Sequence, residues 1–256
     1  HKNMADMAAH GVRTLFLQSP RSGRRATGLV SDPWLLAEFL LAADRTDMAV
    51  VAWYLPKWTS DDEDLDRLVA LSAFEALGHR FDGISVDIEW KDDDLQPAER
   101  SRRLVALGRR LRSAVGTDTL GAIVVPPVVT DVINPDFWPG FPWDQIRTTY
   151  DVWLPMSYWS FRTEEHADPR YYTAENIRLL RENLGDGSAV VHGIGGVGAA
   201  DGTDMPDPGE PLAVLDDLEG FLVGLEEAGA VGGSIYDWVT TGSEARQRLA
   251  EAFSGS

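Results

Sequence analysis

Hydrophobic and polar positions follow two different periods along this chain. Where apolar residues occupy every second position, as at Ile84, Val86 and Ile88, the pattern predicts β-strands, and longer segments with a period near 3.6 predict amphipathic helices. The predicted strands span residues 12–18, 48–55, 84–89, 120–125, 152–158, 189–194 and 232–238. The predicted helices span residues 34–43, 65–77, 97–115, 143–149, 173–184, 215–228 and 243–253.

Strands that alternate with helices predict parallel pairing through right-handed crossovers. We expect an α/β protein with a (β/α)8 TIM barrel, because the chain length and the residues suited to chemistry that repeatedly follow the strands favour a barrel. No sharp linker divides the chain, so we expect a single domain over residues 1–256. The predicted strands are one fewer than a closed barrel contains. The segment from Met4 to His10, with Gly11 as its stop, resembles the end of a helix. We therefore expect the first barrel strand to precede His1.

The strand predicted over residues 84–89 ends in two carboxylates on one face. Asp87 and Glu89 follow Ser85 on that face, with backbone positions ~6.6 Å apart. Two close carboxyls rarely ionise together at neutral pH, and the one that keeps its proton can act as a general acid. Because residues at the carboxyl end of a barrel strand usually do chemistry, we expect both to be catalytic. The alternatives are solvated surface acids or ligands of a structural cation.

Composition limits the partners and cofactors. A net charge of −18 disfavours nucleic acids and anionic membranes as partners, and no apolar run is long enough to span a bilayer. The chain lacks cysteine and has no HxH or HExxH pattern, so we expect no disulfide, no zinc or iron site and no cofactor. Residues 92–94 are interpreted as a hydrated acidic loop rather than a calcium site. The arginines between residues 100 and 112 predict a solvated outer helix face.

A resemblance to a known family rests on two motifs. Asp82-Gly83-Ile84-Ser85-Val86-Asp87-Ile88-Glu89 resembles the DGxDxDxE signature of the family 18 glycoside hydrolases, the chitinases and endo-β-N-acetylglucosaminidases. The resemblance implies that Glu89 protonates the glycosidic oxygen, and that Asp87 orients the substrate acetamido group, which acts as the internal nucleophile. Met156-Ser157-Tyr158 is similar to the family's MxY motif, which implies that Tyr158 supports the same acetamido group.

The sequence departs from the family pattern at three places. Ser85 replaces the first interior Asp of the signature, and Trp159 stands where the family often has Asp. The segment 232–238 resembles the family's GGxMxW motif, but its Trp238 comes one position late and Asp237 takes the expected place. Either a bulge restores Trp238, or Asp237 points into the barrel. An inward Asp237 opposite Glu89 would form a two-carboxylate glycosidase, retaining at ~5–5.5 Å separation or inverting at ~6.5–9.5 Å.

Aromatic side chains near strand ends are candidates for sugar binding. Their flat apolar rings suit the C–H faces of pyranose sugars, and His192, near the end of its strand, suits a sugar hydroxyl. Trp153, early in its strand, is predicted to lie in the core. Residues 126–143 predict a stiff aromatic lip, and residues 195–211 a glycine-rich lid or surface loop. The predicted substrate-binding residues are Trp53, Tyr54, Ser85, Trp90, Trp159, His192 and Trp238.

These observations predict a glycoside hydrolase that cleaves a polysaccharide or glycan. We expect a retaining, acetamido-assisted reaction on N-acetylhexosamine polymers, in a secreted or cell-surface protein whose signal peptide is outside this chain. Three alternatives stay open. The first is the two-carboxylate glycosidase that uses Glu89 and Asp237, and the second is a catalytically inactive carbohydrate-binding barrel, which the changes at Ser85 and Trp159 favour. The third, a metal-dependent phosphodiesterase using Asp82, Asp87 and Glu89, is disfavoured because few basic residues follow the strands.

Overall fold

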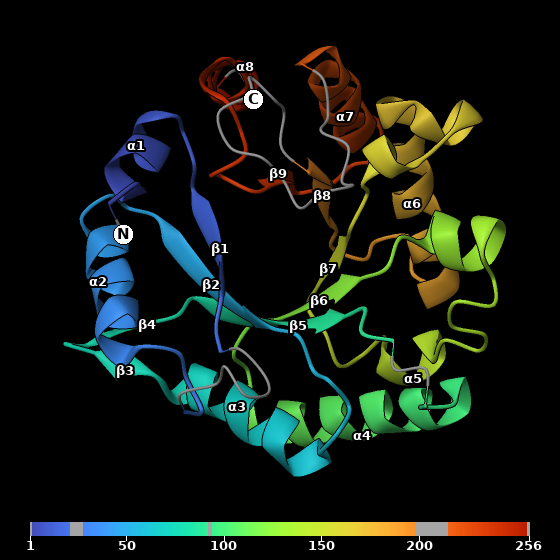
Figure 1. Cartoon of the computed structure of the whole chain (residues 1–256), viewed down its shortest axis with the longest axis horizontal. Coiled ribbons are helices and arrows are strands. Elements are labelled where there is room, and N and C mark those ends of the chain that lie inside the picture. Colours follow the sequence, from blue (N-terminus) through green and yellow to red (C-terminus); the bar gives the residue numbers. More distant parts are fainter. Residues whose placement is uncertain (1, 21–27, 92–93, 198–214, 255–256) are drawn as a thin grey trace. The chain divides into compact units, whose positions relative to one another are not determined.

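The computed structural model of the chain describes residues 2–20, 28–91, 94–197 and 215–254 (Figure 1). The chain forms two compact units, which we describe separately. The first unit comprises His1–Ile123 and Trp138–Val152, and the second comprises Val124–Phe137 and Trp153–Ser256. The single domain expected over residues 1–256, and the strand expected before His1, stay predictions.

Parallel strands form the centre of the first unit. Strand β1 pairs in parallel with β2, and β2 pairs in parallel with β5, beside which β6 lies. The helices cover one side of these strands in Figure 1, and α3 packs along α4. The elements of this unit are α1 (Met4–Ala9), β1 (Thr14–Gln18), α2 (Pro33–Asp44), β2 (Ala49–Tyr54), α3 (Asp61–Ala73), β3 (Glu75–Ala76), β4 (His79–Arg80), β5 (Gly83–Ile88), α4 (Pro97–Val115), β6 (Leu120–Val124) and α5 (Trp143–Ile146).

The register between β2 and β5 decides which side chains share a face. Trp53 lies opposite Ser85, so Trp53 is on the same face as Ser85 and Asp87. Tyr54 lies opposite Val86, on the other face. That second face is fully buried and apolar, because it packs against the covering helices. The polar face of β5 is therefore the one that can carry chemistry.

Local sequence signals fix the ends of the first unit's helices. Asp32 caps α2 by accepting bonds from the backbone N–H groups of Trp34 and Leu35. Ser60 caps α3, and its side chain accepts a bond from the backbone N–H of Glu63. The predicted helix over 65–77 ends earlier, at Ala73, because residues 75–80 form the hairpin of β3 and β4. Gly78, at φ 86°, supplies the left-handed backbone that its turn requires.

The second unit also contains parallel strands with helices. Strand β8 pairs in parallel with β9, and isolated parallel bridges join Trp153 to Val191 and Met156 to Ile194. Helix α6 packs against α7, and α7 against α8. The elements are the π-helix η2 (Val128–Ile133), β7 (Val152–Pro155), the 3-10 helices η3 (Trp159–Phe161) and η4 (Glu164–Ala167), α6 (Pro169–Leu184), β8 (His192–Val197), α7 (Leu215–Glu227), β9 (Gly232–Tyr236) and α8 (Ser243–Ser254).

Strand β8 extends further than its glycines suggest. Residues 195–197 were expected to begin a loop, yet they belong to the strand. A Cβ atom on Gly195 would lie 2.6 Å from Ile235 Cδ1 and 3.0 Å from Phe221 Cζ. Glycine is therefore needed because neighbouring side chains fill that space, and not because the chain turns there. The remainder of the predicted lid, residues 198–211, lies outside the described residues.

Candidate active site

The two predicted catalytic carboxylates lie at the carboxyl end of β5, in the first unit. Asp87 is 4% exposed, and its Oδ1 atom is buried without a hydrogen-bond partner among the described residues. Glu89 follows directly after the strand and is half-buried. A buried carboxylate oxygen that receives no donor from the protein costs free energy unless the group is protonated or a ligand binds to it.

Burial alters the proton affinity of both groups. It raises the pKa of Asp87 well above the ordinary value, and the charge of Glu89 raises it further, while Lys57 acts to lower it. Burial also raises the pKa of Glu89, again against a lowering effect of Lys57. Because the two carboxyls interact, the protons they bind belong to the pair. Such a pair can hold a proton at neutral pH and deliver it to a substrate.

A lysine that the sequence prediction overlooked lies beside this pair. Lys57 follows β2, and its Nζ atom is 2.8 Å from the centroid of the Trp90 ring, the residue next to Glu89. Burial lowers the pKa of Lys57, and the charges of Glu89 and Asp87 act in the opposite direction. The sequence signal that could have identified Lys57 is its position just after β2, the strand that pairs with β5. The structure thus brings Lys57, Asp87, Glu89 and Trp90 together.

The two residues of β2 that were predicted to bind sugar, Trp53 and Tyr54, lie on opposite faces of the strand. Trp53 shares the face of Ser85 and Asp87 and stays a candidate for substrate contact. Tyr54, in contrast, is 1% exposed on the opposite face, and its hydroxyl donates to Asp64 Oδ1 at 2.6 Å. Burial and the bond to Asp64 raise the pKa of Tyr54. Its position is that of a core residue, because its ring and its hydroxyl are both occupied within the protein.

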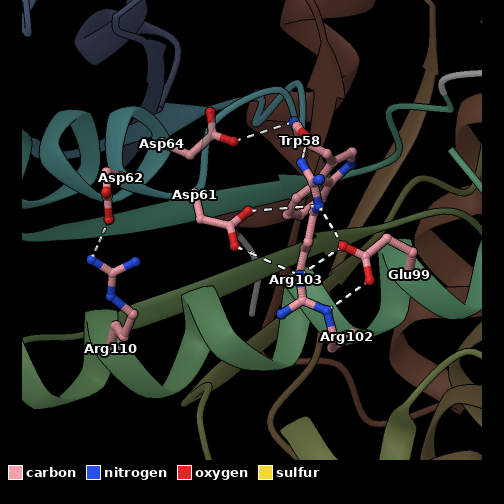
Figure 2. Close-up of polar contacts among 8 residues, drawn as sticks. All are labelled: Trp58, Asp61, Asp62, Asp64, Glu99, Arg102, Arg103 and Arg110. Carbon is pink, nitrogen blue, oxygen red and sulfur yellow. Dashed lines mark hydrogen bonds and ion pairs between the residues drawn. The ribbon is translucent and has the colours of Figure 1, made fainter. Parts of the chain in front are cut away.

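Polar contacts with α3 and with α4 hold the segment after β2 (Figure 2). The Trp58 backbone N–H donates to Asp64 Oδ2 at 3.2 Å, and the Trp58 carbonyl oxygen accepts a bond from Arg103 Nη1. Arg103 is itself bonded to Glu99 at 3.0 Å. Trp58, at φ 59°, has the left-handed backbone that non-glycine residues seldom adopt, and these bonds support it.

A buried arginine supports the chain directly after Glu89. Arg100 is 1% exposed, its guanidinium lies 3.6 Å from the ring centroid of Trp138, and its Nη1 is 3.5 Å from the Trp90 carbonyl oxygen. Burial lowers its pKa to about 10. The solvated face predicted for this helix is therefore wrong at Arg100, because an aromatic ring from a distant segment covers it. Trp138, 2% exposed, belongs to the core rather than to an exposed lip.

In the second unit, Tyr158 belongs to an aromatic cluster. It precedes η3, and its ring centroid lies 6.4 Å from that of Tyr236 and 6.2 Å from that of Phe161. Tyr236 and Phe161 are exposed, so the cluster presents rings at a surface of this unit. Tyr236 was not among the predicted site residues, although it ends β9 directly before Asp237.

Trp159 lies in the core of the second unit. It is 1% exposed, its indole N–H donates to Asp217 Oδ2 at 2.9 Å, and its ring packs 5.4 Å from that of Phe221. Trp159 was predicted to bind sugar, but α7 covers its side chain and leaves almost none of it exposed. Trp153 is 2% exposed, as expected of a core residue.

His192 and Ser234 join β8 to β9 on the face opposite α7. His192 Nε2 lies 3.1 Å from Ser234 Oγ, and burial lowers the pKa of the imidazole to about 4. The ring is therefore neutral at physiological pH and exchanges a hydrogen bond with the serine. Its predicted contact with a substrate hydroxyl stays a prediction.

Asp237 and Trp238 lie beyond the strand that was expected to contain them. Strand β9 ends at Tyr236, and the register shift in this ladder falls opposite it, between Gly195 and Val197 on β8. Asp237 Oδ1 accepts bonds from the Thr240 backbone N–H at 3.0 Å and from the Thr240 hydroxyl at 3.2 Å. The Arg246 guanidinium lies 4.0 Å from the Trp238 ring centroid. The Asp237 side chain therefore takes part in the turn after β9, and the Trp238 ring contacts Arg246 of α8.

Asp82, the remaining acidic residue of the predicted strand motif, lies apart from the carboxyl pair. Asp82, a possible metal ligand by sequence, accepts a bond from the Val50 backbone N–H at 2.8 Å at the amino end of β5, away from Asp87. Among the described residues, no group of three or more His, Cys, Asp or Glu side chains could hold a metal ion. The described helices include none with the length and hydrophobicity needed to cross a bilayer.

Comparisons with known proteins establish the fold. No protein-family model matches the chain, and no curated protein matches its sequence. Among solved structures, domain 2 of the thermostable chitinase from Pyrococcus furiosus, solved as catalytic-site mutants with chito-oligosaccharides, has a TM-score of 0.67 at 10% identity, with 100% of this chain and 90% of that one covered. The chitinase from Chromobacterium violaceum gives 0.63 at 12% identity, with 100% and 95% covered. The β-mannanase from the blue mussel Mytilus edulis gives 0.59 at 10% identity, with 100% and 84% covered.

At such low identity the likeness concerns the fold alone. The similar structures are TIM barrels, and the parallel strands with flanking helices described above agree with them. The predicted α/β fold of the (β/α)8 type is therefore confirmed. In this fold, active sites form at the carboxyl ends of the strands, which is where Asp87 and Glu89 lie.

Proposed function

We propose that the protein is a glycoside hydrolase of the family 18 type, with Glu89 as the acid and Asp87 as its partner. The observation that carries the proposal is the pair itself. A buried Asp87, whose Oδ1 lacks a donor among the described residues, shares a strand face with Glu89, and both have a raised pKa. A carboxylic acid that stays protonated near neutral pH beside an ionised neighbour suits acid-catalysed glycoside cleavage.

The proposed first step moves a proton from Glu89 to the glycosidic oxygen. The bond between that oxygen and the anomeric carbon breaks, and the leaving sugar departs as an alcohol. The acetamido oxygen of the retained sugar bonds to the anomeric carbon and forms a cationic oxazolinium ring. Asp87, as carboxylate, binds the acetamido N–H and stabilises the positive charge. Tyr158 is proposed as a further hydrogen-bond donor to the acetamido group.

The second step returns the proton and releases the product. Glu89, now a carboxylate, removes a proton from water, and the oxygen of that water attacks the anomeric carbon and opens the oxazolinium ring. Two inversions at one carbon retain its configuration. The substrate class that this chemistry requires is a polymer of N-acetylhexosamine. Because such a polymer is too large to cross a membrane unaided, we further propose that the enzyme acts outside the cell or at its surface.

Two alternatives rank below this proposal. In the first, Asp237 is the second carboxylate of an ordinary glycosidase. This is less favoured because Asp237 Oδ1 already accepts two bonds from Thr240. In the second, the barrel binds glycans without cleaving them. The buried Ser85, in place of a carboxylate, favours that reading, while the retained and protonatable Glu89 opposes it.

The test compares matched oligosaccharides with and without the acetamido group. Wild-type protein should hydrolyse chito-oligosaccharides and leave the de-N-acetylated chains and cello-oligosaccharides intact. An Asp237→Asn variant should keep this activity, whereas Asp87→Asn should lose at least about 100-fold. Glu182→Gln, which changes an exposed carboxylate on α6, is the control for amide substitution. Hydrolysis that does not depend on the acetamido group and that is lost in Asp237→Asn would support the two-carboxylate enzyme instead.

A further inference from the structure

A cation–π contact joins the segment after β2 to the residue after Glu89. Lys57 Nζ lies 2.8 Å from the centroid of the Trp90 ring, and the Lys57 side chain is partly buried. A cation over the face of an indole is attracted by the ring quadrupole, more strongly when water is removed from it. Trp90 is 37% exposed, so one part of its ring stays open to solvent. The contact therefore fixes both the ammonium and the ring beside the carboxyl pair.

The charges around this ammonium form a balanced set. Glu89 and Asp87, both on the β5 side, are the charged groups whose fields act on Lys57, and Lys57 in turn acts on each of them. Ser85, buried on the same strand face, brings no charge. One ammonium offsets one carboxylate, because among the described residues a second anion of the pair would lack a counter-charge. The neutral arrangement is one ammonium, one carboxylate and one carboxylic acid.

We propose that Lys57 is a positioning residue of the Asp87–Glu89 site, which fixes the Trp90 ring and keeps the carboxyl pair singly protonated. The inference rests on the proposed function, because the one proton that the singly protonated pair shares is the proton that Glu89 delivers to the glycosidic oxygen, and its transfer leaves Asp87 ionised. Lys57 itself transfers no proton and forms no bond to the reacting atoms in the proposed mechanism. Its effect is to set the pH range in which the pair is active.

The first experiment needs no substrate. The titration of the Asp87 and Glu89 carboxyl carbons is followed by ¹³C NMR in the wild type and in three variants. Lys57→Met should raise both midpoints by about one pH unit or more, because the opposite charge is lost. Lys57→Arg, which keeps the charge, should stay close to the wild type. Lys91→Met removes the same charge from an exposed side chain next to Trp90 and should shift the midpoints little.

Each outcome decides the proposal. Unchanged midpoints in Lys57→Met, or an equal shift in Lys57→Arg or Lys91→Met, would overturn it. Should Lys57→Met not fold, as judged by circular dichroism, Lys57→Gln makes the same charge change with a polar side chain. The indole N–H signal of Trp90 should also move in Lys57→Met and not in Lys57→Arg, because only the first variant removes the cation from the ring.

The second experiment measures the pH dependence of kcat/KM on a chito-oligosaccharide. Both limbs of the profile should move to higher pH in Lys57→Met and stay in place in Lys57→Arg and Lys91→Met. A role in stability alone would lower the rate without moving the limbs, and that result would overturn the proposal. If the wild type hydrolyses no glycan, the proposed function fails, while the carboxyl titration still decides the role of Lys57.

Discussion

The indole N–H of Trp58 donates to the carbonyl oxygen of Trp90 at 3.1 Å. This bond links the segment after β2 to the chain that leaves Glu89, and the Arg100 guanidinium lies beside the same carbonyl. Trp58 is 3% exposed and meets Trp138 edge to face at 6.4 Å. The position of the proposed acid therefore depends on a buried scaffold of aromatic and arginine side chains.

The first prediction concerns this scaffold. Trp58→Phe removes the N–H donor and part of the buried ring, so it should lower the free energy of unfolding by about 1–3 kcal/mol. It should also reduce kcat, because the segment that carries Glu89 loses one of its supports. Urea denaturation and a rate assay measure the two effects. Trp34→Phe, at a side chain that is 84% exposed, is the matched control and should change neither.

The second prediction is a gain of stability at the expense of activity. Burial raises the pKa of Asp87 in the folded protein. The contribution of Asp87 to the free energy of unfolding is therefore full at a pH below its pKa in the unfolded chain, and it is lost as the pH rises through its pKa in the folded protein. Asp87→Asn cannot ionise at this position, so the variant does not lose stability there as the pH rises. Its Tm relative to the wild type should therefore increase between pH 4 and pH 8 by at least ~2 °C, the effect of about 1 kcal/mol in a protein of this size. A Tm difference that shrinks as the pH rises would refute this assignment.

The third prediction tests the packing of β8 in the second unit. Gly195→Ala places a methyl group against Ile235, Phe221 and Trp159, the last at 3.1 Å, and should destabilise the protein by about 1–3 kcal/mol. Gly187→Ala, at a site where an added Cβ meets no atom within 4 Å, should be neutral or slightly stabilising. Thermal unfolding of both variants, side by side, measures the difference. Equal effects would mean that β8 is not packed as described.

The fourth prediction concerns acid stability. Burial lowers the pKa of His192 to about 4, so its contribution to stability is full above the unfolded pKa near 6.5 and is lost as the pH falls toward 4. His192→Gln keeps a partner for Ser234 and removes the titration. The wild type should lose on the order of 2 kcal/mol more than this variant between pH 7 and pH 4.5, as measured by urea unfolding. Parallel losses in the two proteins would show that His192 does not titrate in this window.

The parts of the site that were predictable from sequence are those with a local signal. Ser85, Asp87 and Glu89 alternate with β-branched residues, and a period of two assigns a strand and a shared face without further information. Helix α4 was predicted at its observed bounds, because Pro97 begins it and Gly116 follows its end.

The remainder depends on contacts between distant segments. Trp53 and Tyr54 lie in an entirely apolar run, so only the pairing of Trp53 with Ser85 reveals which of them shares the face of the carboxylates. Arg100 is buried because Trp138 stacks on it, and Lys57 meets Trp90 only when β2 lies beside β5. These contacts cannot be predicted from the local hydrophobic pattern, because each one is formed by tertiary packing.

The central claim is that Glu89 is the acid of a glycoside hydrolase. The most direct measurement is kcat/KM on a chito-oligosaccharide for the wild type and for Glu89→Gln, with folding verified by circular dichroism and with Glu182→Gln as control. We expect activity in the wild type and the control, and a loss of about 100-fold or more in Glu89→Gln, because the amide has the shape of the carboxyl and no acidic proton to donate. A Glu89→Gln variant as active as the wild type would contradict it.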